Sequence, residues 1–253
     1  MRHALVRRPS IHYDRCIRDG HQAIDVALAR EQHAAYVATL RALGVTVTEL
    51  VGDASLPDCC FVEDAAVIVG ADVLITRMAQ PSRRGEATAV ADALDRIGLR
   101  QQRLIAPATL DGGDVLAVGD EIFVGLSTRT NAAAVAALAS LCGAAHVHAV
   151  EVRAGLHLKS AVTQLGGHTL VCHGDAFDVE PMRRAGLTLV PVPEPEGANV
   201  LVVAGTALVS AAAPRTAELI AARGFAVRPL DISEFHKGDG ALTCLSLRWT
   251  TLR

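Results

Sequence analysis

Five helix-like segments of the 253-residue chain each end at a glycine, and this repetition is the feature that most limits its fold. Glycine just past the last helical turn enters the left-handed conformation at little cost, so each glycine marks a helix end. The five glycines lie 54, 45, 43 and 38 residues apart, a period typical of repeat architectures. The predicted helices are Ala27–Leu43, Gly85–Ile97, Asn131–Cys142, Phe177–Ala185 and Thr216–Arg223, followed by Gly44, Gly98, Gly143, Gly186 and Gly224.

Each of these glycines precedes a short strand-like run, and four pairs of apolar runs read as hairpins with a glycine at the turn. The single strands are Val45–Leu50, Gln101–Ile105, Ala144–Val150, Leu187–Pro191 and Phe225–Leu230. The hairpins are Ala65–Val69 with Val73–Thr76, Val115–Val118 with Ile122–Gly125, Ser160–Leu165 with Thr169–Cys172, and Val200–Val203 with Ala207–Ser210. The repeat unit is therefore strand–strand–helix–strand.

A fifth hairpin is missing as a continuous piece, but the two chain ends supply its halves. Gly240–Trp249 and His3–Arg7 are both strand-like, and their pairing would close the repeat into a ring with no uncapped unit. We therefore predict an α/β fold, a five-bladed α/β propeller of ββαβ repeats that forms one domain over residues 1–253. The alternative is an ordinary open α/β sheet, which also alternates strands and helices.

Composition and charge argue against several classes of protein. Apolar residues make up 51% of the chain, which is enough for a large core, and the net charge of -3 provides no basic face for a nucleic acid. No apolar run approaches the roughly 20 residues that span a bilayer, and the N-terminus does not resemble a secretory signal. We expect a cytoplasmic protein without nucleic-acid or membrane partners, and leave a homodimer open.

Four charged or reactive segments fall at the beginning of a hairpin strand, each in a different repeat. Ring closure would bring these beginnings to one end of a central channel. Singly, each has a structural explanation, since Asp-Gly pairs usually form turns and a lone His or Cys near an apolar strand is usually core. Together they favour a site. The segments contain Asp58, Glu63 and Asp64; Asp111 and Asp114; His157; and Asp239 and Cys244.

The residue types of this predicted site suit attack on a guanidinium group. None of the six cysteines forms a Cys-x-x-Cys pair, so a structural zinc site or a redox dithiol is not indicated. Cys244 needs a base or cation to become a thiolate, and His157 could serve. Clustered carboxylates would bind a planar cation, which would itself favour the thiolate. Arg83 or Arg129 could bind an amino-acid carboxylate, although arginines at helix starts are commonly solvent-exposed.

Several motifs resemble the dimethylarginine dimethylaminohydrolase family, in the right order and over essentially the whole chain. They include Phe-Val-Glu-Asp (61–64), Pro-Ser-Arg-Arg (81–84), Leu-Asp-Gly-Gly-Asp-Val-Leu (110–116), Val-Gly-Leu-Ser-x-Arg-Thr-Asn (124–131), Leu-His-Leu-Lys-Ser (156–160) and Asp-Gly-x-Leu-Thr-Cys (239–244). The resemblance implies the pentein fold. It also implies hydrolysis of dimethylarginine or monomethylarginine to citrulline and an amine, through a covalent cysteine S-alkylthiouronium intermediate and without a cofactor or metal.

The same resemblance implies a role for each matched residue. Cys244 would attack the guanidinium carbon, and His157 would protonate the leaving amine and then activate water. Gly238 stands where a branched residue is usual, so we expect a looser loop before Asp239. The implied contacts are Glu63, Asp64 and Asp239 with the guanidinium, Asp58 with the α-amino group, Arg83 and Arg129 with the carboxylate, Asp111 with His157 and the guanidinium, and the main chains of Ile17 and Gly238 with the substrate.

Three other functions compete with this interpretation. An arginine deiminase or amidinotransferase shares the fold and the Cys–His chemistry, but its chain is longer and carries insertions absent here. A non-catalytic pentein that binds the ribosome would not need Cys244, His157 and the acids together. A metal-dependent hydrolase would have to use His146 and His148, the only close histidine pair, which strand alternation explains without metal.

Overall fold

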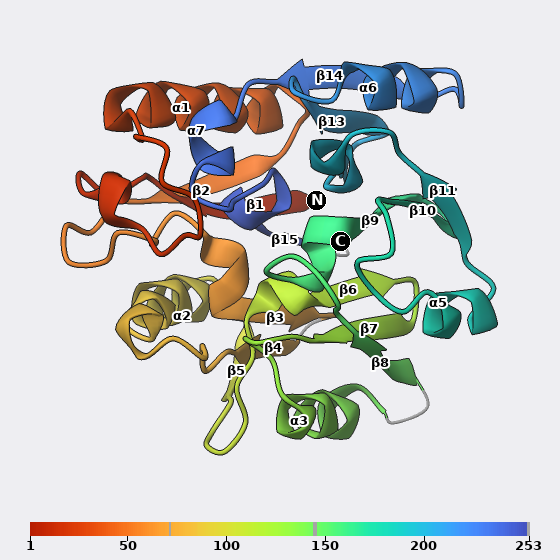
Figure 1. Ribbon diagram of the computed structural model, residues 1–253. Coiled ribbons are helices and arrows are strands. Elements are labelled where there is room, and N and C mark those ends of the chain that lie inside the picture. Colours follow the sequence, from red (N-terminus) through yellow and green to blue (C-terminus); the bar gives the residue numbers. More distant parts are fainter. Residues whose placement is uncertain (71, 144–145, 252–253) are drawn as a thin grey trace.

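The computed structural model describes residues 1–70, 72–143 and 146–251. Over this part of the chain the strands form five separate sheets of three, which confirms the predicted five-bladed propeller (Figure 1). From the inner to the outer strand, the sheets are β15 (Leu247–Thr250), β1 (Arg2–Arg7) and β2 (Thr46–Leu50); β3 (Ala66–Val69), β4 (Asp72–Ile75) and β5 (Arg100–Arg103); β6 (Val115–Val118), β7 (Glu121–Leu126) and β8 (Val147–Glu151); β9 (Val162–Gly166), β10 (Thr169–Cys172) and β11 (Thr188–Pro191); β12 (Leu201–Val203), β13 (Thr206–Ser210) and β14 (Ala226–Leu230).

All five sheets have the same strand directions. The inner strand pairs antiparallel with the middle strand, and the middle strand pairs parallel with the outer one, to which a helical crossover connects it. The ring closes as predicted, because β15 of the C-terminus pairs antiparallel with β1 in the register Leu5↔Leu247. The C-terminal strand is therefore the inner strand of a sheet whose middle strand comes from the N-terminus.

Five helices cover the outside of the ring (Figure 1) and are α1 (Val26–Ala42), α2 (Glu86–Arg96), α3 (Ala132–Cys142), α5 (Glu180–Arg184) and α6 (Pro214–Ala221). The five glycines that follow them all have positive φ angles, between 76° and 92°. Only Glu180–Arg184 of the predicted helix Phe177–Ala185 is helical. Pro181 lacks an N–H and is tolerated best in a first helical turn, where it lies, and Phe177 instead forms a β-bridge with Val152. Residues 144–145 of the predicted strand Ala144–Val150 lie outside the described residues.

The apolar core is divided into five clusters, each in the wedge between two neighbouring sheets and under one helix. In one wedge, Leu5 and Trp249 of the terminal sheet pack with Val73 of the next sheet and Val90 of α2. This division explains why small and branched aliphatic residues suffice, since no wedge is large. Among the described residues, no helix is long and apolar enough to cross a membrane.

A short helical turn precedes the inner strand of every sheet, and the sequence interpretation missed this feature. The turns are η2 (Val62–Ala65), η4 (Gly112–Asp114), α4 (Leu158–Ala161), η6 (Pro195–Ala198) and η7 (Thr243–Leu245). The predicted strands Ser160–Leu165 and Gly240–Trp249 were therefore wrong at their beginnings. Polar residues that looked like strand ends, such as Asp64, Asp114 and His157, lie in or just before these turns.

Candidate active site

Residues of the turns η2 and η7, and His157 just before α4, line a small cavity in the channel, and this cavity brings together most of the residues that the sequence singled out. All the predicted site residues line it except Glu63, Asp111 and Asp114. The cavity also has three lining residues that were not predicted, namely Phe61, Leu156 and Gly240. The predicted residues in its wall are Ile17, Asp58, Asp64, Arg83, Arg129, His157, Gly238, Asp239 and Cys244.

A second cavity of about 440 Å³ lies between the inner strands of the sheets and is lined by Glu63, Lys159 and Thr243. The Glu63 carboxylate lies 2.6 Å from the Lys159 Nζ and accepts a 2.8 Å hydrogen bond from the Thr243 hydroxyl. Glu63 was expected beside the guanidinium, but it lines the second cavity, where Lys159 and Thr243 bind its carboxylate.

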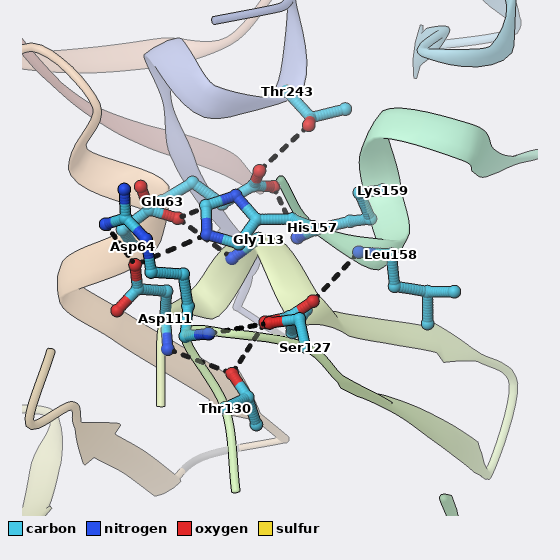
Figure 2. A network of polar contacts seen from close by, with 12 residues as sticks. Glu63, Asp64, Asp111, Gly113, Ser127, Thr130, His157, Leu158, Lys159 and Thr243 are labelled. Atoms are coloured by element: carbon cyan, nitrogen blue, oxygen red, sulfur yellow. Dashed lines mark hydrogen bonds and ion pairs between the residues drawn. The ribbon is translucent and has the colours of Figure 1, made fainter. Parts of the chain in front are cut away.

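His157 is held between two buried carboxylates (Figure 2). Its Nε2 lies 3.3 Å from Asp111 Oδ2, and its Nδ1 lies 4.0 Å from Asp64 Oδ1. Burial disfavours the imidazolium, but Asp64 and the hydrogen bond to Asp111 outweigh it, so the pKa of His157 is raised above its usual value. A protonated imidazole in this place can give a proton to a leaving group and take one back from water.

Two features of the turn η4 position the histidine. Gly113 donates its N–H to Asp64 Oδ1 at 3.0 Å, and a Cβ atom on Gly113 would lie only 2.5 Å from His157 Nδ1. The neighbouring Asp114 accepts the N–H of Leu158 at 2.9 Å, which fixes the residue after His157. The Gly-Gly-Asp sequence therefore provides both the space for the imidazole ring and an anchor for its main chain.

Arg83 and Arg129 are buried rather than solvent-exposed. Arg83 donates to Asp64 at 3.0 Å and, in a bidentate pair, to Glu86 at 3.0 and 2.9 Å. Arg129 lies 3.4 Å from Asp111 Oδ2. Burial raises the pKa of Glu86 to about 7, although its ion pair with Arg83 opposes this. Sequence reasoning overlooked Glu86, which the i,i+3 spacing from Arg83 would have indicated.

Cys244 lies within the turn η7, where its N–H donates to the carbonyl of Ala241 at 3.2 Å. Its side chain remains partly accessible. Burial, followed by the charges of Glu63 and Asp64, raises the pKa of the thiol to about 12, whereas Lys159 acts in the opposite direction. Without a further cation in the cavity, Cys244 is therefore a thiol at neutral pH.

The segment that follows the short turn η1 (Tyr13–Arg15) is held over the cavity by two of the predicted binding carboxylates. The N–H of Ile17 donates to Asp58 at 3.1 Å, and the N–H of Asp19 donates to Asp239 Oδ2 at 2.8 Å. Burial raises the pKa of Asp58. Asp58 and Asp239 thus each accept a main-chain hydrogen bond from this segment.

Packing gives a steric reason for glycine at position 238, while the looser loop expected from the sequence stays a prediction. A Cβ atom at this position would lie 2.4 Å from the hydroxyl of Tyr13 and 3.1 Å from Cys16 Sγ. Tyr13 is fully buried and packs edge-on against Phe61. The tyrosine ring therefore occupies the space that a side chain at position 238 would need.

In the described part of the chain, one group of three His, Cys, Asp or Glu side chains has its potential metal-ligand atoms within 4.8 Å of one another, and it consists of Asp64, Asp111 and His157. Both carboxylates already pair with arginines, Asp64 with Arg83 and Asp111 with Arg129. The two carboxylates are therefore better suited to stabilising a protonated His157 than to binding a metal ion with it.

A five-bladed α/β propeller with a cysteine, a histidine and buried acids in its channel is a pentein of the kind that modifies guanidino groups. The family model "N,N dimethylarginine dimethylhydrolase, eukaryotic" matches residues 10–188. The chain belongs to this family, as its motifs predicted, and is a hydrolase that acts on carbon–nitrogen bonds.

Relatives and solved structures agree with this assignment. The N(G),N(G)-dimethylarginine dimethylaminohydrolase of Streptomyces coelicolor is 43% identical, over 97% of this chain and 96% of its own. A variant of the Pseudomonas aeruginosa enzyme, complexed with citrulline, superposes with a TM-score of 0.91 at 32% identity, over 98% of each chain. A second such enzyme, an adduct with S-methyl-L-thiocitrulline, gives a TM-score of 0.91 at 32% identity, over 98% of this chain and 99% of that one.

Proposed function

We propose that the chain, acting as a single catalytic domain over residues 1–253, hydrolyses dimethylarginine and monomethylarginine to citrulline and dimethylamine or methylamine. The observation that carries the proposal is the placement of Cys244 and His157 on one cavity, with His157 between Asp64 and Asp111. The citrulline complex and the thiocitrulline adduct of the related enzymes support the same product and a covalent route.

The first half of the reaction forms the thiouronium intermediate. The positive guanidinium group enters a cavity in which Cys244 is a thiol, and the thiol proton leaves to solvent. The sulfur then donates an electron pair to the guanidinium carbon and a C–S bond forms. His157 gives its proton to the methylated nitrogen as the C–N bond breaks, and the amine departs.

The second half regenerates the enzyme. His157, now neutral, takes a proton from water, and the resulting hydroxide adds to the carbon of the thiouronium. The C–S bond breaks with its electron pair on Cys244, the hydroxyl proton passes to this sulfur so that Cys244 is a thiol again, and citrulline remains. The buried carboxylates of Asp64 and Asp111 stabilise the imidazolium of His157 at the start and at the end of this cycle.

Recognition of the amino-acid end of the substrate falls mainly to Arg129. Arg83 donates through all three of its nitrogens to Asp64 and Glu86, so its guanidinium is committed to these acids. Arg129 makes one side-chain hydrogen bond within the described residues, to Asp111, and its other N–H groups can bind a carboxylate. Asp58 would accept a hydrogen bond from the α-amino group, either in addition to the one it accepts from the Ile17 N–H or in its place.

Citrulline release from a panel of guanidino compounds tests the proposal. Wild type should produce citrulline from dimethylarginine and monomethylarginine, Cys244→Ser should produce none, and Cys142→Ser, which alters a cysteine at the end of α3, should behave as wild type. Equal citrulline from wild type and Cys244→Ser would sink the catalytic assignment.

The alternative, an arginine deiminase-like hydrolase with another guanidino substrate, is tested by the same panel. The substrate assignment fails if unmethylated arginine is clearly the better substrate. A cytoplasmic location and a homodimer stay predictions.

A further inference from the structure

Arg248 lies on β15, three residues after the end of the turn η7 that carries Cys244. Its Nη1 donates to the carbonyl of Ser246 at 2.9 Å, to the hydroxyl of Ser246 at 2.7 Å and to the carbonyl of Thr243 at 3.3 Å. Its Nη2 lies 3.6 Å from Glu63 Oε1. One guanidinium group thus holds both sides of Cys244 in the chain and also faces a buried acid.

These contacts belong to a chain of polar groups beneath the nucleophile. Ser246 is fully buried, and its hydroxyl also shares a 2.6 Å hydrogen bond with Tyr36. Glu63 is held by Thr243 and Lys159 on its other side. Because Thr243 and Ser246 flank Cys244 closely, any movement of these two residues would move the sulfur.

Arg248 acts from outside the substrate cavity. It lines the second cavity, between the inner strands, and does not line the cavity that contains His157 and Cys244. Its side chain is 30% exposed, whereas Glu63 is 5% exposed. The guanidinium therefore reaches from the second cavity to a buried carboxylate whose negative charge acts on Cys244.

We propose that Arg248 is a positioning residue for the nucleophile, which fixes the Thr243–Ser246 segment and orients the Glu63 carboxylate away from the sulfur. This inference rests on the proposed function, because it concerns the reactivity of Cys244. Lys159 neutralises Glu63 at shorter range, so the main contribution of Arg248 is geometric: three hydrogen bonds from a charged donor to one short segment.

Arg248→Met keeps an unbranched side chain of similar length and removes every donor. We expect kcat for dimethylarginine to fall about tenfold to a hundredfold, the effect expected when a reacting group is misplaced by about 1 Å. KM should stay unchanged, since Arg248 does not line the substrate cavity. Arg248→Lys, which keeps the charge but not the fork of donors, should recover part of the loss. Arg100→Met, which removes an exposed ion pair with Asp72, is the matched control and should leave kcat unchanged.

Alkylation by iodoacetamide, followed for the peptide of each cysteine by mass spectrometry, provides a readout that does not need turnover. Cys244 should react at a different rate and with a shifted pH profile in Arg248→Met, whereas Cys142 in the same molecule serves as the internal reference. If the variant is only less stable, its melting temperature falls but kcat per folded site and the alkylation profile do not change, and the inference is overturned. If wild type makes no citrulline, the proposed function fails, while the alkylation profile still decides the role of Arg248.

Discussion

Gly113→Ala tests most directly whether the position of His157 controls the reaction. The added Cβ would lie 2.5 Å from His157 Nδ1, 2.8 Å from its Cγ and 3.0 Å from Asp64 Oδ1, whereas ordinary contact begins near 3.4 Å. Gly113 lies in a short helical turn without a positive φ angle, so alanine suits its backbone. The imidazole ring would have to retreat by about 1 Å, which can cost roughly a hundredfold in rate.

A hundredfold loss corresponds to about 2.7 kcal/mol of transition-state stabilisation. The measurement is kcat for citrulline formation by Gly113→Ala, with thermal unfolding in parallel, because overpacking typically costs about 1–3 kcal/mol of stability. Gly85→Ala is the matched control, since its Cβ would make an ordinary 3.4 Å contact with Leu56. A folded Gly113→Ala enzyme with kcat within about threefold of wild type would refute the reasoning, because a shift of this size at the acid–base group should cost far more.

Two further predictions concern the groups around the nucleophile. Glu63→Gln removes a negative charge that favours the neutral thiol, so the pKa of Cys244 should fall from about 12. Alkylation of Cys244 should then begin at lower pH, and an unchanged pH profile would contradict the electrostatic account. Gly238→Ala should destabilise the fold by about 1–3 kcal/mol, and Tyr13→Phe in the same chain should restore part of this stability, because the clash is with the tyrosine hydroxyl. Strictly additive effects in thermal unfolding would show that the two positions do not interact.

The architecture could be predicted because its determinants are local in the sequence. Each of the five glycines ends a helix by its own backbone conformation, and the hairpins follow from alternating apolar runs and turn residues. Ring closure followed from counting the repeats, since Gly240–Trp249 and His3–Arg7 each lacked a partner. The family could likewise be assigned, because its motifs are contiguous stretches of chain.

Side-chain directions within the site could not be predicted, because they depend on the helical turns before the inner strands. A strand reading of Gly240–Trp249 puts Cys244 in a pleated ladder, whereas the turn η7 aims it at His157's cavity. The direction of the Glu63 side chain could not be predicted for the same reason, since the turn η2 directs it toward Lys159. The strands of the sheet β12–β13–β14 were predicted, but the contribution of this repeat to the site was overlooked. Asn199, just before β12, holds Thr243 through two hydrogen bonds, and a single asparagine carries no motif.

The close packing of Tyr13 against Gly238 also could not be predicted from the sequence. The two residues are 225 positions apart, and only the packing of the N-terminal segment against the loop before Asp239 brings the tyrosine hydroxyl to the glycine. Gly238 differs from the branched residue that is usual in the family, and the difference is explained by the residue that occupies the space of the missing side chain. Here that residue is Tyr13, which no motif contains.

The balance of charge in the channel explains why the nucleophile can rest as a thiol. Asp64 and Asp111 are each compensated by an arginine and by His157, and Glu63 is compensated by Lys159. A thiolate at Cys244 would therefore be an additional buried anion without a partner, which is costly. The substrate guanidinium brings one positive charge, so loss of the thiol proton leaves the net charge of the cavity as it was. Reactivity is thus coupled to the arrival of a cation of the right shape, and a neutral electrophile such as iodoacetamide should react with Cys244 only slowly at neutral pH and faster as the pH rises.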